Sequence, residues 1–161
     1  MKKLALIFTL LAAPLYAGDI LVEDAFARVS RPDAPAGAAF MTIHNKGETD
    51  DRLISVTSPI AQVVQLHTHK ETAEGVMKMM HVEEGFEVKA GMMHTLARGG
   101  DHVMMMGING PINEGDEIPV TLIFEKAGEI EVMISVDNKR GQMGHGEMDH
   151  SKHKMKKDEG S

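Results

Sequence analysis

Short apolar runs separated by turn residues fill most of the chain between Asp19 and Val136. Apolar and polar positions alternate within many of these runs, which is typical of half-buried strands, and almost no run has a sustained helical period. The pattern predicts strands at residues 20–29, 38–45, 52–58, 61–69, 75–82, 86–89, 94–97, 102–107, 118–127 and 129–136. So many short strands without helices favour an all-β fold, a Greek-key sandwich or barrel, over a parallel α/β fold.

The two ends of the chain break this pattern. Residues 1–17 combine Lys2 and Lys3 with the apolar run LALIFTLLAAPL and end at Ala17, as a secretory signal does. We expect cleavage near Ala17, with Ala13 as the alternative, and an exported, periplasmic mature form without a membrane span. From about residue 138 the sequence is polar and cannot bury enough surface to offset its ordering entropy. The expected organisation is a signal peptide (1–17), one domain (18–137) and a flexible His/Met-rich tail (138–161).

Composition narrows the possible chemistry. A formal charge of −7 argues against nucleic acid, which needs clustered cations. The absence of Cys excludes disulfides, zinc–thiolate sites, iron–sulfur clusters and thiol nucleophiles. The chain is rich in two other ligand types, with 14 Met and 9 His beside five Phe and one Tyr. Any metal ion must therefore be held by nitrogen, oxygen or thioether sulfur.

Three predicted strands carry ligand-capable pairs at i, i+2 spacing, which places both members of a pair on one face. The pairs are His67 with His69, Met77 with Met79, and His102 with Met104. A hairpin through residues 70–75 brings the first two segments together, and a Greek-key return can add the third. Imidazole and thioether donors without a carboxylate favour Cu(I), so the pattern indicates a copper site.

The alternative is that these side chains have ordinary structural roles, since Met is a common core residue. We assign the remaining strand and turn residues of both types in that way. The methionines expected to pack are Met41, Met92, Met93 and Met133, and the histidines expected at the surface or in local hydrogen bonds are His44, His81 and His94.

Two stretches resemble the PCu(A)C family of periplasmic copper chaperones. They are LHTHKETAEGVMKMMHVEEGFEV (66–88) and LARGGDHVMMMGINGPINEGDEIPVTLIFEKAG (96–128), and the likeness extends over most of residues 20–136. The resemblance implies a cupredoxin-like Greek-key barrel that delivers Cu(I) to the dinuclear copper centre of cytochrome c oxidase. The Cu(I) ligands that it implies are His67, Met79, His102 and Met104.

The ligand assignment has open alternatives. The loop after His67 is one residue longer than in many members of the family, and Met79 is followed directly by Met80. Met77 or Met80 could therefore replace Met79, and His69 could serve as a spare or transient ligand.

The tail has its own pattern of possible ligands. His-rich tracts bind metal ions by composition, and the resemblance associates such extensions with a second copper, including Cu(II). The residues concerned are Met143, His145, Met148, His150, His153 and Met155.

The sequence thus predicts a copper chaperone and not an enzyme, because no catalytic constellation is apparent. The expected partner is subunit II of cytochrome c oxidase or another copper chaperone in its assembly, recognised through exposed Met105 or Met106. The alternative function is periplasmic copper storage or detoxification, with the tail as the main copper sink.

Overall fold

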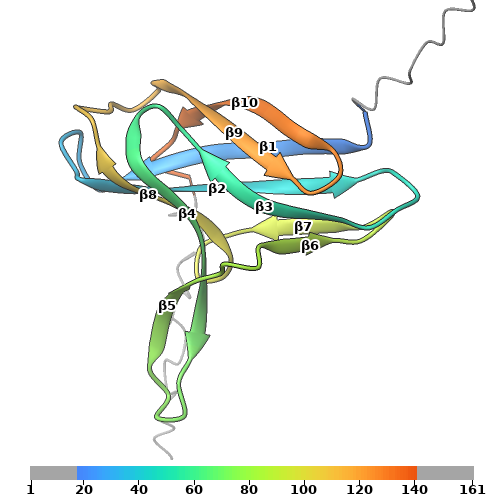
Figure 1. The fold of residues 1–161 in the computed structure, drawn as a ribbon. Coiled ribbons are helices and arrows are strands. Elements are labelled where there is room, and N and C mark those ends of the chain that lie inside the picture. Colours follow the sequence, from blue (N-terminus) through green and yellow to red (C-terminus); the bar gives the residue numbers. More distant parts are fainter. Residues whose placement is uncertain (1–17, 141–161) are drawn as a thin grey trace, which may run out of the picture.

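Ten strands and no helix form residues 18–140, the part of the chain that the computed structural model describes (Figure 1). The all-β class is confirmed, and each predicted strand is present. With no helix, these residues contain none that could cross a membrane. The proposed signal peptide and residues 141–161 of the tail lie outside the described residues. The strands are β1 (Ile20–Val29), β2 (Ala36–Asn45), β3 (Asp51–Thr57), β4 (Ala61–Glu71), β5 (Met77–His81), β6 (Phe86–Val88), β7 (Met93–Leu96), β8 (His102–Ile108), β9 (Glu117–Phe124) and β10 (Gly128–Val136).

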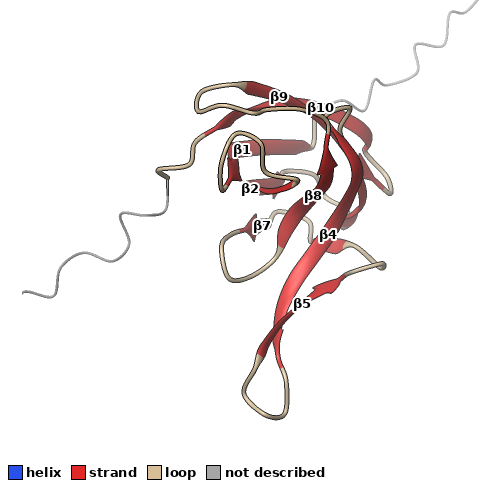
Figure 2. Cartoon of the chain, turned by 90° about the vertical axis from the view of Figure 1, so that its left-hand side faces the viewer, coloured by secondary structure: helices blue, strands red, loops and turns tan. Residues whose placement is uncertain are grey.

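The sheet has the strand order β5-β4-β8-β2-β1-β10-β9-β3-β6 and curls on itself, so that β3 also packs against β4 (Figure 2). The pairing of β1 with β10 is parallel and joins the first strand to the last. All other pairings are antiparallel. β2 pairs with β1 along most of its length and, on its other side, with β8 and then β7. β8 therefore lies between β2 and β4, in the middle of the surface formed by β5, β4, β8, β2 and β1.

Alternation along the strands separates the core from the outer face. In β9, Ile118, Val120, Leu122 and Phe124 are all buried, and the residues between them are not. Burying each such side chain contributes about 1.5–3 kcal/mol. The core also contains Met41, as predicted.

Four of the methionine predictions are wrong. Met105 was expected to be exposed, but it is fully buried because it alternates with Met104 on β8 and faces the core. Conversely, Met92, Met93 and Met133 were expected to pack inside, and each exposes more than half of its side chain. Met105 therefore cannot form a recognition surface, and the three others belong to the molecular surface.

The hairpin of β4 and β5 projects from the body of the molecule (Figure 1). The first part of β4, Ala61–His67, pairs with β8, and the remainder, His67–Glu71, pairs with β5. All five residues of β5 are exposed. This arrangement carries β5 out to the edge of the sheet, where it extends the surface formed by β4 and β8.

Two glycines provide a matched test of the fold. Gly85 and Gly91 both have positive φ, 74° and 69°, which L side chains adopt at a cost of about 1–2 kcal/mol. A Cβ on Gly85 would overlap the carbonyl oxygen of Leu53, whereas a Cβ on Gly91 meets nothing within 4 Å. Gly85→Ala is therefore expected to lower the free energy of unfolding in urea by clearly more than Gly91→Ala does. Equal losses would contradict the packing of the β5–β6 turn against β3.

Candidate metal site

The three ligand-bearing segments pair side by side on β5, β4 and β8, as the sequence predicts. His67 lies opposite both His81 on β5 and His102 on β8. His69 lies opposite Met79 on β5. Directly opposed residues of an antiparallel pair share a face, and this face points away from the core because Leu66, Val103 and Met105 point inward. The outer face of these strands thus carries both ligand types.

Three imidazole contacts define the centre of this face. Ring centroids are 5.1 Å apart for His69 and His102, 5.9 Å for His67 and His102, and 5.8 Å for His67 and His81. With metal–nitrogen bonds of about 2.0 Å, two imidazoles that share one metal ion have centroids about 5–6 Å apart. Both His67 and His69 are therefore within reach of a metal ion bound to His102.

A hollow of about 260 Å³ opens beside these rings. Its walls include Met79, His102 and Met104, which are three of the four predicted ligands. The second imidazole on its wall is His69, one of the alternatives, while His67 lies next to His102 outside this lining. The other lining residues are Ala38, Phe40, Arg98 and Gly99.

The neighbouring methionines differ in orientation. Met77 lies opposite Glu71, farther along the projecting hairpin, on the same face as Met79. Met80 lies opposite Thr68 and faces the other side of the sheet. Met79 is thus the methionine of β5 whose register places it beside the imidazoles.

One backbone carbonyl positions two of the imidazoles. The carbonyl oxygen of Gly100 accepts hydrogen bonds from Nδ1 of His102 at 2.9 Å and from Nδ1 of His69 at 3.3 Å. A neutral imidazole that donates through Nδ1 keeps its lone pair on Nε2, the form that a metal ion needs. The loop from Ala97 to Asp101 therefore orients both rings. Sequence analysis missed Gly100, since only its position two residues before His102 could have indicated this role.

His67 has an unpaired nitrogen inside the cluster. Its Nε2 lies 3.0 Å from Oε1 of Gln65, so it donates there, which leaves the lone pair on Nδ1. Nδ1 is buried and has no hydrogen-bond partner in the structure. Leaving a buried polar atom unsatisfied costs about 1–3 kcal/mol, and coordination of a metal ion would satisfy it.

The environment keeps His67 neutral. Burial, followed by the imidazoles of His102, His81 and His69, lowers the pKa of His67 from its usual value of 6.5. A lone pair is therefore available on this residue at lower pH than on an ordinary histidine.

Two other histidines have local roles, as predicted. His44 pairs with Glu23 at 2.8 Å, and His94 pairs with Asp101 at 2.9 Å. His81, expected at the surface or in a local hydrogen bond, is exposed at the surface, and its ring also contacts that of His67. Within residues 18–140, no three His, Asp or Glu side chains are arranged to hold a metal ion by themselves.

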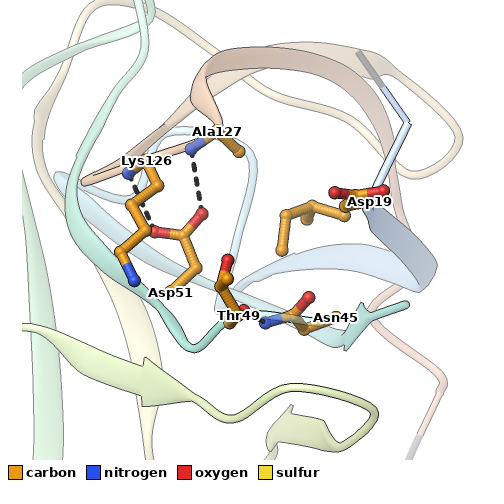
Figure 3. Close-up of a pocket in the computed structure, with 7 residues that line it drawn as sticks. Asp19, Asn45, Thr49, Asp51, Lys126 and Ala127 are labelled. Carbon is orange, nitrogen blue, oxygen red and sulfur yellow. Dashed lines mark hydrogen bonds between the residues drawn. The ribbon is translucent and has the colours of Figure 1, made fainter. Parts of the chain in front are cut away.

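A second hollow, near the other end of the sheet, has a structural explanation (Figure 3). The carboxylate of Asp51 is buried there and accepts the backbone N–H groups of Arg52, Lys126 and Ala127. The amide of Asn45 donates to the carbonyl oxygens of Thr49 and Val88. These groups are satisfied by the chain itself, so this hollow is a hydrogen-bonded corner that fixes the turn between β9 and β10.

The family model for LpqE-like proteins, described as putative lipoproteins, matches residues 20–136. The chain therefore belongs to the LpqE-like family. A relative from Leifsonia xyli subsp. xyli (strain CTCB07), named putative lipoprotein Lxx21020, is 35% identical over 104 residues. That match covers 65% of this chain and 62% of the relative.

Solved structures of PCuAC domains have the same fold. The copper-bound PCuAC domain from PmoF2 is 27% identical and matches with a TM-score of 0.61 over 74% of this chain and 93% of that one. The Cu(I) form of DR1885 from Deinococcus radiodurans is 29% identical and matches with a TM-score of 0.58 over 72% of this chain and 76% of that one. The resemblance to the PCu(A)C family and the cupredoxin-like fold are confirmed.

The pKa of His67 provides a test of the cluster. Its lowered value means that the unfolded chain takes up this proton at higher pH, so the fold loses stability as the pH falls through about 6.5. His81→Gln removes one of the neighbouring imidazoles that lower the pKa of His67, and it is expected to raise that pKa in an NMR titration of the ring proton signals. His44→Gln, which alters a histidine paired with Glu23, should leave it unchanged. An unchanged pKa in His81→Gln would show that the two rings do not interact.

Proposed function

We propose that this protein is a copper-binding chaperone whose main site holds one Cu(I) ion through His67, Met79, His102 and Met104. The observation that carries the proposal is the buried, unpaired Nδ1 of His67. The ring centroid of His67 lies 5.9 Å from that of His102, which lines a hollow together with the thioethers of Met79 and Met104. Two nitrogen and two sulfur donors without a carboxylate select Cu(I) over zinc, magnesium or calcium. The printed descriptions of the PmoF2 domain and DR1885 as copper-bound forms support the same metal.

The exposure of the site fits a carrier. Met79 exposes 47% of its side chain, and the hairpin that carries it projects from the body. His102, at 2% exposure, anchors the other side. An ion held between one buried and one accessible donor can be passed to a partner that replaces the accessible ligand first. We therefore propose that copper is cargo here and not the cofactor of an enzyme.

The proposed recipient is the dinuclear copper centre of cytochrome c oxidase, on subunit II, or another copper chaperone in its assembly. The resemblance to the PCu(A)C family supports this step, together with the signal-like residues 1–17, which imply a periplasmic location. The proposal includes an auxiliary copper in the tail, bound as Cu(I) or Cu(II) by the ligands between Met143 and Met155.

A competition titration tests the main site. Loss of an outer-shell partner alone costs about 10- to 100-fold in metal affinity, so His102→Ala with Met104→Ala should weaken Cu(I) binding by more than about 100-fold. The measurement is titration of the full chain against a chromogenic Cu(I) chelator. His44→Ala with Met133→Ala is the matched control, because it removes the same residue types elsewhere on the surface. Equal affinities in the two double variants would refute the site.

The fourth ligand can be identified separately. Copper X-ray absorption of the Cu(I) form should count two sulfur and two nitrogen donors. His67→Gln is expected to remove one nitrogen from that count, and His69→Gln to leave it unchanged. The opposite result would assign the fourth position to His69, which lines the hollow.

Removing the metal ligands of the tail distinguishes a copper storage protein from a copper chaperone. Replacing its six histidine and methionine ligands by Ser in the full chain leaves one tight Cu(I) if the protein is a chaperone. A storage protein would lose most of its copper capacity, which equilibrium dialysis measures. That second result would favour the alternative function.

A further inference from the structure

Three hollows on the outer face meet at the same two residues. Phe40 and Arg98 line the metal hollow, and they also line two neighbouring hollows that extend away from it. The first of these continues past Met104 to Arg28, and the second reaches Phe26 and Arg140. Together they form a trough that begins at the candidate metal site and crosses β2 to β1.

The sheet register explains why these side chains gather. Phe26 on β1 lies opposite Phe40 on β2, and Arg28 lies opposite Ala38, which in turn lies opposite Met104 on β8. All therefore share the outer face with His102. Phe40 is 6% exposed and yet is not part of the core cluster, because it lies on the outer face, where its ring contacts those of Phe26 and His102.

The trough is positively charged on an otherwise acidic molecule. Arg140 stacks over the ring of Phe26 at 4.5 Å and pairs with Asp24 at 3.1 Å. Arg28 donates one hydrogen bond to the carbonyl oxygen of Asn138. Arg98 is exposed and has no hydrogen-bond or ion-pair partner among residues 18–140. Three guanidinium groups thus face one carboxylate here, while the whole chain carries a formal charge of −7.

This combination fits one kind of ligand. A guanidinium group binds a carboxylate through two parallel N–H donors, and the phenylalanine and methionine side chains offer an apolar floor between the charges. The excess of acidic residues elsewhere repels a negatively charged protein, so such a partner would meet this chain at the trough. That orientation brings the metal hollow directly to the partner.

We propose that the trough formed by Arg28, Phe40, Arg98 and Met104 docks an acidic segment of the protein that exchanges copper with this chain. The copper part of this statement rests on the proposed function, whereas the docking part does not. Arg98 is the central contact, since it borders all three hollows and has a free guanidinium group. Its side chain would exchange water for a partner carboxylate next to the metal ligands.

The docking part is tested on the copper-free full chain with a five-glutamate peptide. The peptide should shift the backbone amide signals of Ala38, Phe40, Arg98 and Met104 in NMR spectra. Arg98→Gln should weaken binding by about threefold, the size expected for one exposed ion pair. Arg52→Gln is the control, because Arg52 is a partly exposed arginine on β3 whose guanidinium group donates a hydrogen bond to the carbonyl oxygen of Glu84.

Several outcomes would overturn docking of a protein segment. Equal weakening by Arg98→Gln and Arg52→Gln would indicate unspecific charge attraction. Binding of a five-lysine peptide with the same shifts would show that charge has no role. Free glutamate that binds as tightly as the peptide would make the trough a site for small carboxylates instead.

A second arm tests the link to copper exchange. The Cu(I)-loaded chain is mixed with a peptide that has a Met-Gly-Met-Gly-Met segment flanked by glutamates. The rate of copper transfer to this peptide is compared with the rate of transfer to a control peptide in which the flanking residues are glutamines. The glutamate version should take copper faster, and Arg98→Gln should abolish the difference. Equal rates would overturn the role in exchange even if docking occurs. A chain that binds the five-glutamate peptide but no copper would refute the proposed function and leave docking intact.

Discussion

The position of β8 between β2 and β4 is the constraint on which the rest of the surface depends. Its alternation directs Val103 and Met105 into the core and turns His102 and Met104 outward. Burial of the inward pair is worth several kcal/mol, so a register slip that moved the ligands would also expose the core. The same burial that stabilises the fold therefore holds the outward donors in place.

Much of this arrangement could be predicted from sequence because period-two alternation is a local signal. All ten strands were found, and the i, i+2 spacing placed His102 and Met104 on one face. The error over Met105 arose from the run of three methionines, which has no polar residue to mark its outward side. The exposure of Met92 and Met93 could not be inferred either, since it depends on where β7 begins against β2.

The contacts between loops and strands could not be predicted from local sequence patterns, because they join residues that are far apart in the chain. The position of Gly100 two residues before His102 is the one local sign that its carbonyl oxygen could reach that ring, and no local sign connects it to His69. Those rings are separated by about thirty residues, and only the antiparallel pairing of β4 with β8 brings them together. The burial of Nδ1 of His67 and the meeting of Arg98 with Phe40 along the same hollows likewise depend on tertiary structure. Sequence could thus suggest the donors but not how their protons are arranged.

The projecting hairpin has a consequence for the chemical stability of its methionines. Met77, Met79 and Met80 on β5 each expose about half of their side chains. Oxidants therefore have direct access to these thioethers, and sulfoxide formation would replace a soft sulfur by a hard oxygen that suits Cu(I) poorly. A chain oxidised in this way would keep its fold, because no residue of β5 belongs to the core cluster, and would carry sulfoxides where the candidate site has thioethers. A methionine sulfoxide reductase would restore those sulfur atoms.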